Sequence, residues 1–146
     1  MEDRQVSIIY NKFCPYAQRA LITAIEKDLQ VTFVKTGLGE QTKTKFFSEA
    51  YGRALGRDPS SNGKVPVLIH GDRYITESQL VCWYMAENFN TGSRLIPDDA
   101  FKKMKMRIWI DRINVELISI FDRAKLKRIG VLEDFIKEIE GFLERV

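Results

Sequence analysis

Apolar positions in the first third of the chain predict a strand, a helix and a second strand. Residues 6–10 (VSIIY) are apolar and β-branched, which indicates a short buried strand. After Pro15, apolar residues recur at the i, i+3, i+4, i+7 and i+8 positions of one helix face. Residues 31–35 (VTFVK) alternate like a second strand. A loop over 36–42 and a helix over 43–55 complete this part.

The next segment predicts a hairpin followed by a helix. A loop rich in turn-forming residues covers 57–63, and an apolar run follows at 65–69. A turn at 70–73 returns the chain into a strand at 74–76, and residues 77–88 carry helical spacing. The order is β-α-β-α-β-β-α, an α/β arrangement. Its first half needs a right-handed parallel crossover and its second half is a hairpin.

The remainder of the chain predicts helices only. Residues 90–97 (NTGSRLIP) are turn formers and read as a linker. Asp98 is the predicted cap of a long helix that runs to about residue 126. Residues 127–130 break that helix, and a last helix runs to 146. We therefore expect two domains, residues 1–89 and 98–146, with the second all-α.

Composition narrows the class of protein. Apolar residues make up 45% and charged residues 29% of 146 residues, which is typical of a globular protein. The net charge is +3, and basic residues alternate with acidic ones over 98–112, so no nucleic acid partner is expected. No apolar run reaches the roughly 18 residues that a membrane span needs. Two cysteines and no signal-like N-terminus favour a cytoplasmic protein.

Cys14 is the strongest chemical feature of the sequence. It lies between the first strand and the first helix, and Pro15 suits the first helical turn. The free N–H groups and positive dipole end of a helix N-terminus favour thiolate over thiol. Because the thiolate is the nucleophile, the placement predicts a reactive cysteine. A buried, inert cysteine is the alternative.

Two further features point to a peptide-like ligand. Pro66 interrupts an apolar run, and a cis Val65–Pro66 bond would leave the Val65 backbone free to pair with an extended peptide. A trans proline at an edge strand is the alternative. Glu77 and Ser78 precede a helix whose N–H groups can bind a carboxylate, while Glu77 can accept from an ammonium group. An ordinary helix cap is the alternative there.

Together these features resemble the omega-class glutathione transferases, with the related dehydroascorbate reductases and chloride-channel-like proteins. The resemblance covers about residues 7–114, and its motifs are 13–19 (FCPYAQR), 64–68 (KVPVL), Glu77-Ser78 and 95–99 (LIPDD). It implies a thioredoxin-like N-terminal domain followed by an all-α C-terminal domain. The resemblance also implies that this second domain is incomplete here, since family members have a helical domain about twice as long.

The resemblance also implies site residues. Cys14 would form a mixed disulfide with glutathione. The implied glutathione contacts are Phe13, Lys43, Val65, Pro66, Glu77 and Ser78. In the family pattern Lys43 meets the glycyl carboxylate, the Val65 backbone pairs with the cysteinyl part, and the Glu77-Ser78 pair holds the γ-glutamyl end.

The resulting expectation is a glutathione-dependent thiol transferase that acts on a small disulfide, an electrophile or dehydroascorbate. Ala17 stands where glutaredoxins carry a second cysteine, so a second glutathione or another thiol would resolve the mixed disulfide. The alternative is a non-catalytic binding or scaffold module; a membrane-entering form is disfavoured. No metal is expected, because His70 has no partner at ligand spacing and reads as a surface turn residue. Uncovered apolar positions over 101–146 predict a homodimer.

Overall fold

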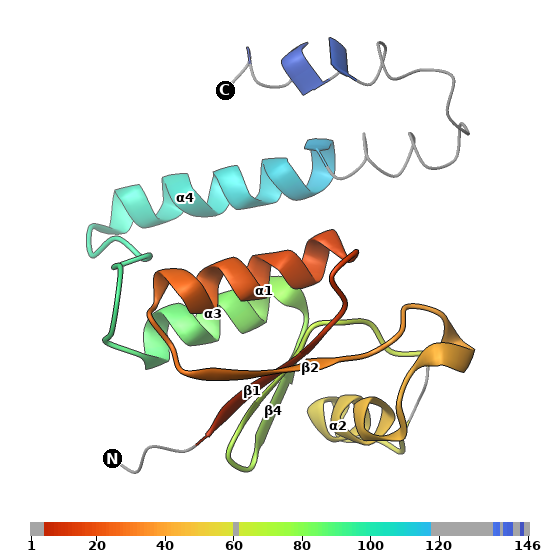
Figure 1. Cartoon of the computed structure of the whole chain (residues 1–146). Coiled ribbons are helices and arrows are strands. Elements are labelled where there is room, and N and C mark those ends of the chain that lie inside the picture. The colour runs from red at the N-terminus through yellow and green to blue at the C-terminus, as the bar shows by residue number, and fades with distance from the viewer. Residues whose placement is uncertain (1–4, 60–61, 118–135, 138, 142–143, 145–146) are drawn as a thin grey trace. The chain divides into compact units, whose positions relative to one another are not determined.

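The structure is a computed structural model, and it describes residues 5–59, 62–117, 136–137, 139–141 and 144. The chain forms two compact units, Met1–Ile96 and Pro97–Val146. The first unit carries the predicted strands, and the second is helical in its described part (Figure 1). The domain division at residues 89 and 98 stays a prediction.

A four-stranded sheet organises the first unit. Its strands are β1 (Val6–Tyr10), β2 (Val31–Lys35), β3 (Val67–His70) and β4 (Arg73–Thr76), in the order β2-β1-β3-β4. β1 runs parallel to β2 and antiparallel to β3, while β3 and β4 form a hairpin. The α/β order β-α-β-α-β-β-α and the thioredoxin-like fold class are thereby confirmed.

Helices cover both faces of this sheet. The helices α1 (Pro15–Glu26) and α3 (Ser78–Asn88) lie on one face, and α2 (Lys45–Leu55) lies on the other (Figure 1). The core on the α1–α3 face consists of Val6, Ile8, Ala20, Ala24, Leu68, Val81 and Met85. The core on the α2 face consists of Ile9, Ala17, Phe47, Ala50, Tyr51, Val65 and Val67. Neighbouring strand residues therefore divide between the two cores, as strand geometry requires.

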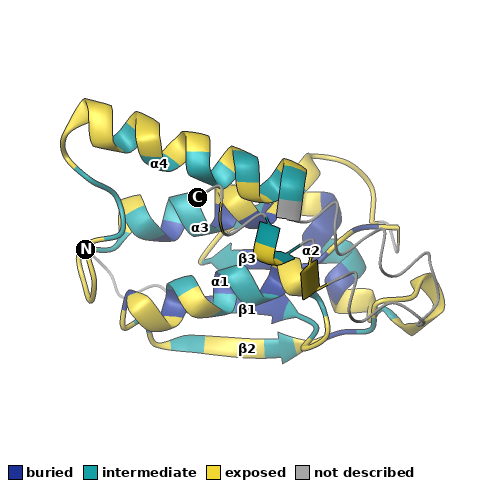
Figure 2. Cartoon of the chain, turned by 90° about the horizontal axis from the view of Figure 1, so that it is seen from above, coloured by how far each residue is buried: buried dark blue, intermediate teal, exposed yellow. Residues whose placement is uncertain are grey.

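The position of each strand in the sheet explains its exposure. The central strand β1 is largely buried, whereas the edge strand β2 is exposed or half-buried along its length (Figure 2). The two half-buried residues of β2 face different cores: Val31 packs against the core on the α1–α3 face, and Val34 packs against the core on the α2 face.

Helix α2 begins two residues later than predicted. Thr44 is its N-cap, and the Thr44 hydroxyl accepts a hydrogen bond from the Phe47 N–H at 3.1 Å. Threonine satisfies a free N–H at this position, which the Lys43 side chain cannot do. The preceding loop also contains a short 3-10 helix, η1 (Glu40–Thr42), that the pattern did not indicate.

The prediction that His70 is a surface turn residue is wrong. His70 is the last residue of β3, pairs with Arg73 of β4 and is half-buried. Its Nδ1 atom lies 2.8 Å from the Tyr84 hydroxyl, and its ring centroid lies 5.1 Å from that of Phe89. The turn contains only two residues and starts with Gly71 at a φ of 62°, so histidine falls within the strand.

The segment after α3 is fastened to the C-terminal end of α1. The Ser93 N–H donates to the Glu26 carbonyl at 2.7 Å, and the Thr91 hydroxyl donates to the Lys27 carbonyl at 2.6 Å. The Lys27 side chain is buried and donates to the Ser93 carbonyl at 3.1 Å. Gly92 has a φ of 59°, and a Cβ at this position would lie 2.4 Å from the Glu26 oxygen.

The second unit contains α4 (Ala100–Arg112), followed by a π-helical segment, η2 (Ile113–Leu117). The predicted cap Asp98 is wrong by one residue, because the Asp99 carboxylate accepts from the Lys102 N–H at 2.8 Å. The predicted continuation to residue 126, the break at 127–130 and most of the last predicted helix lie outside the described residues. Within the described part of the chain, no helix combines the length and apolar character of a membrane span.

Candidate active site

The loops that follow β1, β2 and β4 and the loop that precedes β3 all lie at the same end of the sheet. Tyr10, the last residue of β1, pairs with Lys35, the last residue of β2. One residue earlier in β1, Ile9 pairs with Val67 at the start of β3, and Val67 pairs with Thr76 at the end of β4. The Cys14 loop, the loop before α2, the Val65–Pro66 segment and the start of α3 therefore leave the sheet together.

Cys14 lies at the N-cap position of α1, as predicted. Its side chain makes no capping hydrogen bond, and the residue is half-buried. The Cys14 N–H donates to the Asn11 carbonyl at 3.1 Å, which closes the turn between strand and helix. The thiol points to the Val65 carbonyl, with Sγ and oxygen 3.9 Å apart. Cys14 and Val65, 51 residues apart in the sequence, are thus neighbours.

The Val65–Pro66 peptide bond is cis, so this prediction is confirmed. Both residues are buried, and β3 begins at the next residue, Val67. The Val65 N–H forms no hydrogen bond to another described residue. Within the part of the chain that the structure describes, the Val65 backbone therefore combines an N–H that has no backbone acceptor with a carbonyl that the Cys14 thiol contacts.

Glu77 occupies an unusual backbone conformation next to α3. Its φ is 68° and its ψ is 113°, a region in which a residue with a Cβ is strained by about 1–3 kcal/mol. Its side chain is exposed and makes no capping hydrogen bond, so the carboxylate does not act as an ordinary helix cap. Such strain is typical of residues that are held in place at functional sites.

Ser78 is the first residue of α3 and is buried, with 8% of its surface exposed. Its hydroxyl accepts a hydrogen bond from Arg19 Nη1 at 3.5 Å. The Arg19 guanidinium also lies 5.3 Å from the centre of the Tyr16 ring. Sequence reasoning missed Arg19, although the residue belongs to the FCPYAQR motif and follows Cys14 on α1. It connects the thiol-bearing helix to the start of α3.

Phe13 directly precedes Cys14 in the sequence, and Lys43 is the second residue before α2. The Lys43 ammonium donates to the Gly63 carbonyl, two residues before Val65, and lies 5.4 Å from the centre of the Phe47 ring. The Lys43 ammonium group is thus directed at a backbone oxygen of the segment that precedes Val65. Phe13 is 75% exposed.

The second cysteine lies in a different environment. Cys82 is on α3, is half-buried, and burial raises the pKa of its thiol above the ordinary value. A hydrogen bond from Thr23 and the charge of Arg19 oppose that rise in pKa. The residues that the structure describes contain no group of three side chains able to hold a metal ion.

The sequence is similar to proteins of the glutathione transferase family. Residues 9–93 match the family model for the N-terminal domain of glutathione S-transferase. Glutathione S-transferase omega-1 of Rattus norvegicus is 30% identical over 145 residues, which are 96% of this chain and 55% of the rat protein. The chain spans about half the length of the curated relatives it matches, between 47% and 55% for three of them.

Solved structures agree on the fold. The structure of glutathione transferase Omega 3C from Trametes versicolor matches with a TM-score of 0.73 and 20% identity, over 98% of this chain and 59% of that one. The structure of rice GST1 in complex with glutathione matches with a TM-score of 0.66 and 23% identity, over 82% of this chain and 51% of that one. Because the family model takes in more than half of the residues, the chain belongs to the glutathione S-transferase family.

Proposed function

We propose that the protein is a glutathione-dependent thiol transferase with Cys14 as its nucleophile. The observation that carries the proposal is the 3.9 Å contact between Cys14 Sγ and the Val65 carbonyl, beside the cis bond to Pro66. An extended peptide that pairs with the Val65 backbone would bring its own sulfur close to this thiol. The glutathione complex of the similar rice protein supports glutathione as that peptide.

The other site residues are proposed to hold the two charged ends of glutathione. The Glu77 carboxylate would accept from the γ-glutamyl ammonium, and the Ser78 hydroxyl with the N-terminus of α3 would bind the γ-glutamyl carboxylate. Lys43 would turn from the Gly63 carbonyl to the glycyl carboxylate. Phe13 would cover the ligand from the solvent side. The exposure of Glu77 and the burial of Ser78 support these two separate roles at the γ-glutamyl end.

The proposed reaction is thiol–disulfide exchange. The Cys14 thiolate attacks the glutathione sulfur of a mixed disulfide; the new S–S bond forms, the old one breaks, and the other thiol leaves as thiolate. The thiolate of a second glutathione then attacks the glutathione sulfur on Cys14, which releases glutathione disulfide and restores the Cys14 thiolate. Dehydroascorbate reduction is a proposed variant, in which two glutathione molecules supply two electrons. Position 17 is alanine, so no thiol on that turn competes with the second glutathione.

Turnover of a small glutathione mixed disulfide tests the proposal. Cys14→Ser removes the nucleophile and is expected to abolish turnover, whereas the matched variant Cys82→Ser is expected to keep it. Retained turnover in Cys14→Ser would overturn the assignment of the nucleophile. Glutathione binding without turnover in the wild-type protein would instead favour a binding or scaffold module.

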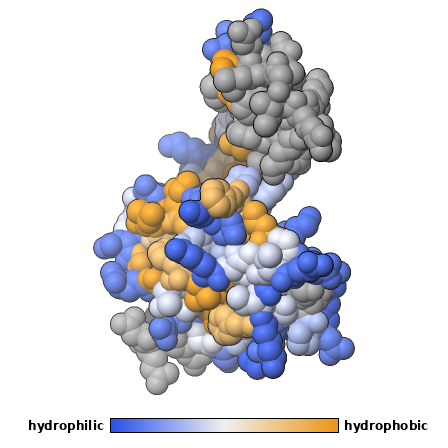
Figure 3. All heavy atoms as spheres, turned by 45° about the vertical axis from the view of Figure 1, so that its right-hand side comes forward, coloured by the Kyte–Doolittle hydropathy of each residue, from blue (hydrophilic) through white to orange (hydrophobic). Residues whose placement is uncertain are grey.

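A homodimer in the cytoplasm is part of the proposal. Exposed apolar side chains support the dimer, among them Phe101, Ile108 and Val115 of the second unit, which are 69%, 56% and 65% exposed. On the face drawn in Figure 3, apolar surface lies open among hydrophilic surface. Both cysteines are free, which suits a reducing compartment. The two compact units support the proposed domains, residues 1–89 and 98–146.

A further inference from the structure

Asn11, the first residue after β1, uses its backbone and both ends of its side chain to hold the Cys14 loop. Its Oδ1 accepts from the Phe13 N–H at 3.0 Å, and its carbonyl accepts from the Cys14 N–H at 3.1 Å. Its Nδ2 donates across the sheet end to the Thr36 carbonyl at 2.6 Å. The residue therefore shapes the turn locally and fastens it to the neighbouring strand.

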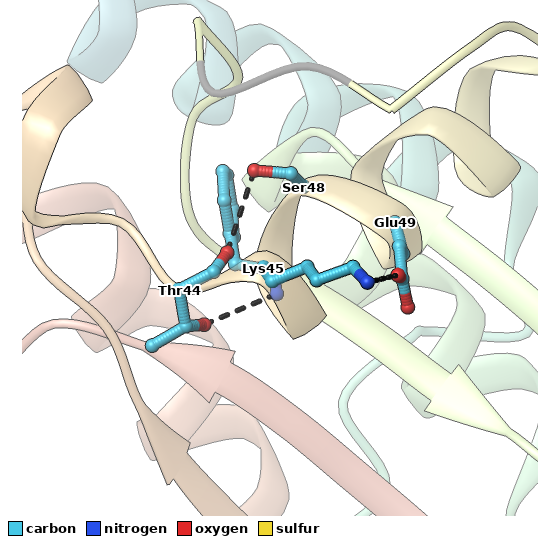
Figure 4. Close-up of polar contacts among 5 residues, drawn as sticks. Thr44, Lys45, Ser48 and Glu49 are labelled. Atoms are coloured by element: carbon cyan, nitrogen blue, oxygen red, sulfur yellow. Dashed lines mark hydrogen bonds and ion pairs between the residues drawn. The ribbon is translucent and has the colours of Figure 1, made fainter.

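Thr36 continues this connection toward α2. It follows β2, is 7% exposed, and its N–H donates to the Tyr10 carbonyl at 2.9 Å. Its hydroxyl accepts from the Thr44 N–H at 3.2 Å. Thr44 is in turn the cap of α2, bonded to the Phe47 N–H and to the Ser48 hydroxyl (Figure 4). The Cys14 loop and the start of α2 are thus joined through two half-buried hydrogen bonds at Thr36.

Further contacts lead from the start of α2 back to Cys14, so that the hydrogen bonds form a closed ring around the proposed glutathione site. Lys43, the neighbour of Thr44, donates to the Gly63 carbonyl, and Gly63 is two residues from Val65. The Val65 carbonyl in turn lies 3.9 Å from the Cys14 Sγ atom. Three segments proposed to contact glutathione are therefore placed relative to one another by one ring of contacts. In this ring, the Asn11 side chain links the thiol loop to the Thr36 carbonyl, beside the backbone hydrogen bond between Thr36 and Tyr10.

We infer that Asn11 is a positioning residue for Cys14 and acts through Thr36. The inference rests on the proposed function, since it concerns where the thiol stands relative to bound glutathione. Loss of the Asn11 side chain leaves the helix start intact: Pro15 remains, the Asn11 carbonyl still accepts from Cys14, and Gln18 still donates to the Lys12 carbonyl at 2.8 Å. The position of Cys14 at the start of α1 is preserved, but the placement of its side chain against Val65 is not.

The test therefore compares the chemical reactivity of Cys14 with the placement of its sulfur relative to a docked ligand. In a Cys82→Ser background, the rate of Cys14 is measured with glutathione disulfide, which must dock, and with iodoacetamide, which need not. Asn11→Ala is expected to lower the glutathione disulfide rate by about tenfold or more, because small misplacements of reacting groups have effects of that size. The iodoacetamide rate is expected to stay within about twofold, since it follows the thiolate.

Two further variants separate positioning from general loss of structure. Thr91→Val also removes a side-chain hydrogen bond of 2.6 Å to a backbone carbonyl, at the other end of α1, and is expected to leave the ratio of the two rates unchanged. Asn11→Asp keeps the acceptor for Phe13 and loses the donor to Thr36, so it is expected to behave like Asn11→Ala.

The outcomes are distinct. The inference is overturned if Asn11→Ala keeps the wild-type ratio, if both rates fall equally, or if Asn11→Asp behaves like the wild-type residue. Failure of the proposed function has a different signature in the Cys82→Ser parent: Cys14 reacts with glutathione disulfide no faster than with a small disulfide that lacks the glutamyl and glycyl parts. That result overturns both proposals, whereas a parent that prefers glutathione disulfide leaves the variants to decide the inference.

Discussion

Glu77 is held in a backbone conformation that a side chain disfavours, so glycine at this position should separate stability from binding. The φ of 68° and ψ of 113° cost about 1–3 kcal/mol for a residue with a Cβ. Glycine has no Cβ and so relieves part of that penalty, but it adds freedom to the unfolded chain, which costs about 0.4–1 kcal/mol. We expect Glu77→Gly to raise the free energy of unfolding by about 1 kcal/mol.

The same substitution removes a proposed contact with glutathione. A hydrogen bond to a charged group contributes about 1.5–3 kcal/mol, and 1.4 kcal/mol is about tenfold in affinity. Glutathione binding is therefore expected to weaken by about tenfold or more. A gain of about 1 kcal/mol in stability corresponds to a rise of about 2–4 °C in the unfolding midpoint for a chain of this size. Higher stability should thus accompany weaker binding.

Thermal unfolding without ligand and calorimetric titration with reduced glutathione measure the two effects. Glu77→Ala is the matched control, because it removes the carboxylate but keeps the Cβ and its strain. Its midpoint is expected near that of the wild-type protein, with binding as weak as in Glu77→Gly. Asp28→Gly is the control for relief of strain elsewhere: Asp28 has a φ of 49° at the end of α1, and binding is expected to be unchanged.

A midpoint of Glu77→Gly at or below that of Glu77→Ala would refute the strain argument. Unchanged glutathione affinity in both variants would refute the binding role of the carboxylate. The two results are independent, so each part of the reasoning is tested separately.

Three other predictions follow from cysteine chemistry, packing and assembly. Iodoacetamide near neutral pH should modify Cys14 faster than Cys82, because burial raises the pKa of the Cys82 thiol and delays its thiolate to higher pH; equal rates in peptide mass spectra would contradict this. Gly92→Ala should destabilise the fold by more than about 1 kcal/mol in denaturant titrations, since its Cβ would lie 2.4 Å from the Glu26 oxygen. Gly56→Ala, at a φ of 62° with nothing within 4 Å, should lose less, and equal losses would refute the steric part. Light scattering at micromolar concentration should give the mass of a dimer; a stable monomer would rule out the proposed assembly.

Features with a local cause could be predicted from the sequence. The bounds of β1 and β2 agree because β-branched, apolar stretches end in polar residues. The Cys14 position follows from a strand, a proline and a helical period that all lie within twenty residues. The start of α2 was misplaced because a cap depends on which side chain reaches the free N–H groups, and here that side chain is Thr44.

Features set by distant parts of the chain could not be predicted. The positive φ of Glu77 depends on how the end of β4 joins α3, and no local pattern reports it. The contact of Arg19 with Ser78 joins residues 59 positions apart, and that of Asn11 with Thr36 joins residues 25 apart. All four of these residues are polar, and from the sequence alone a polar residue in such a stretch indicates only that it is exposed to solvent. Their roles follow from the parallel and antiparallel registers that bring four loops to one end of the sheet.

The claim that Cys14 takes glutathione as a mixed disulfide is tested most directly by mass spectrometry of the wild-type protein after incubation with glutathione disulfide. The account predicts one glutathione on the peptide that contains Cys14, none on the peptide that contains Cys82, and removal of the adduct by reduced glutathione. An adduct on Cys82 alone, or no adduct on either cysteine, would contradict it.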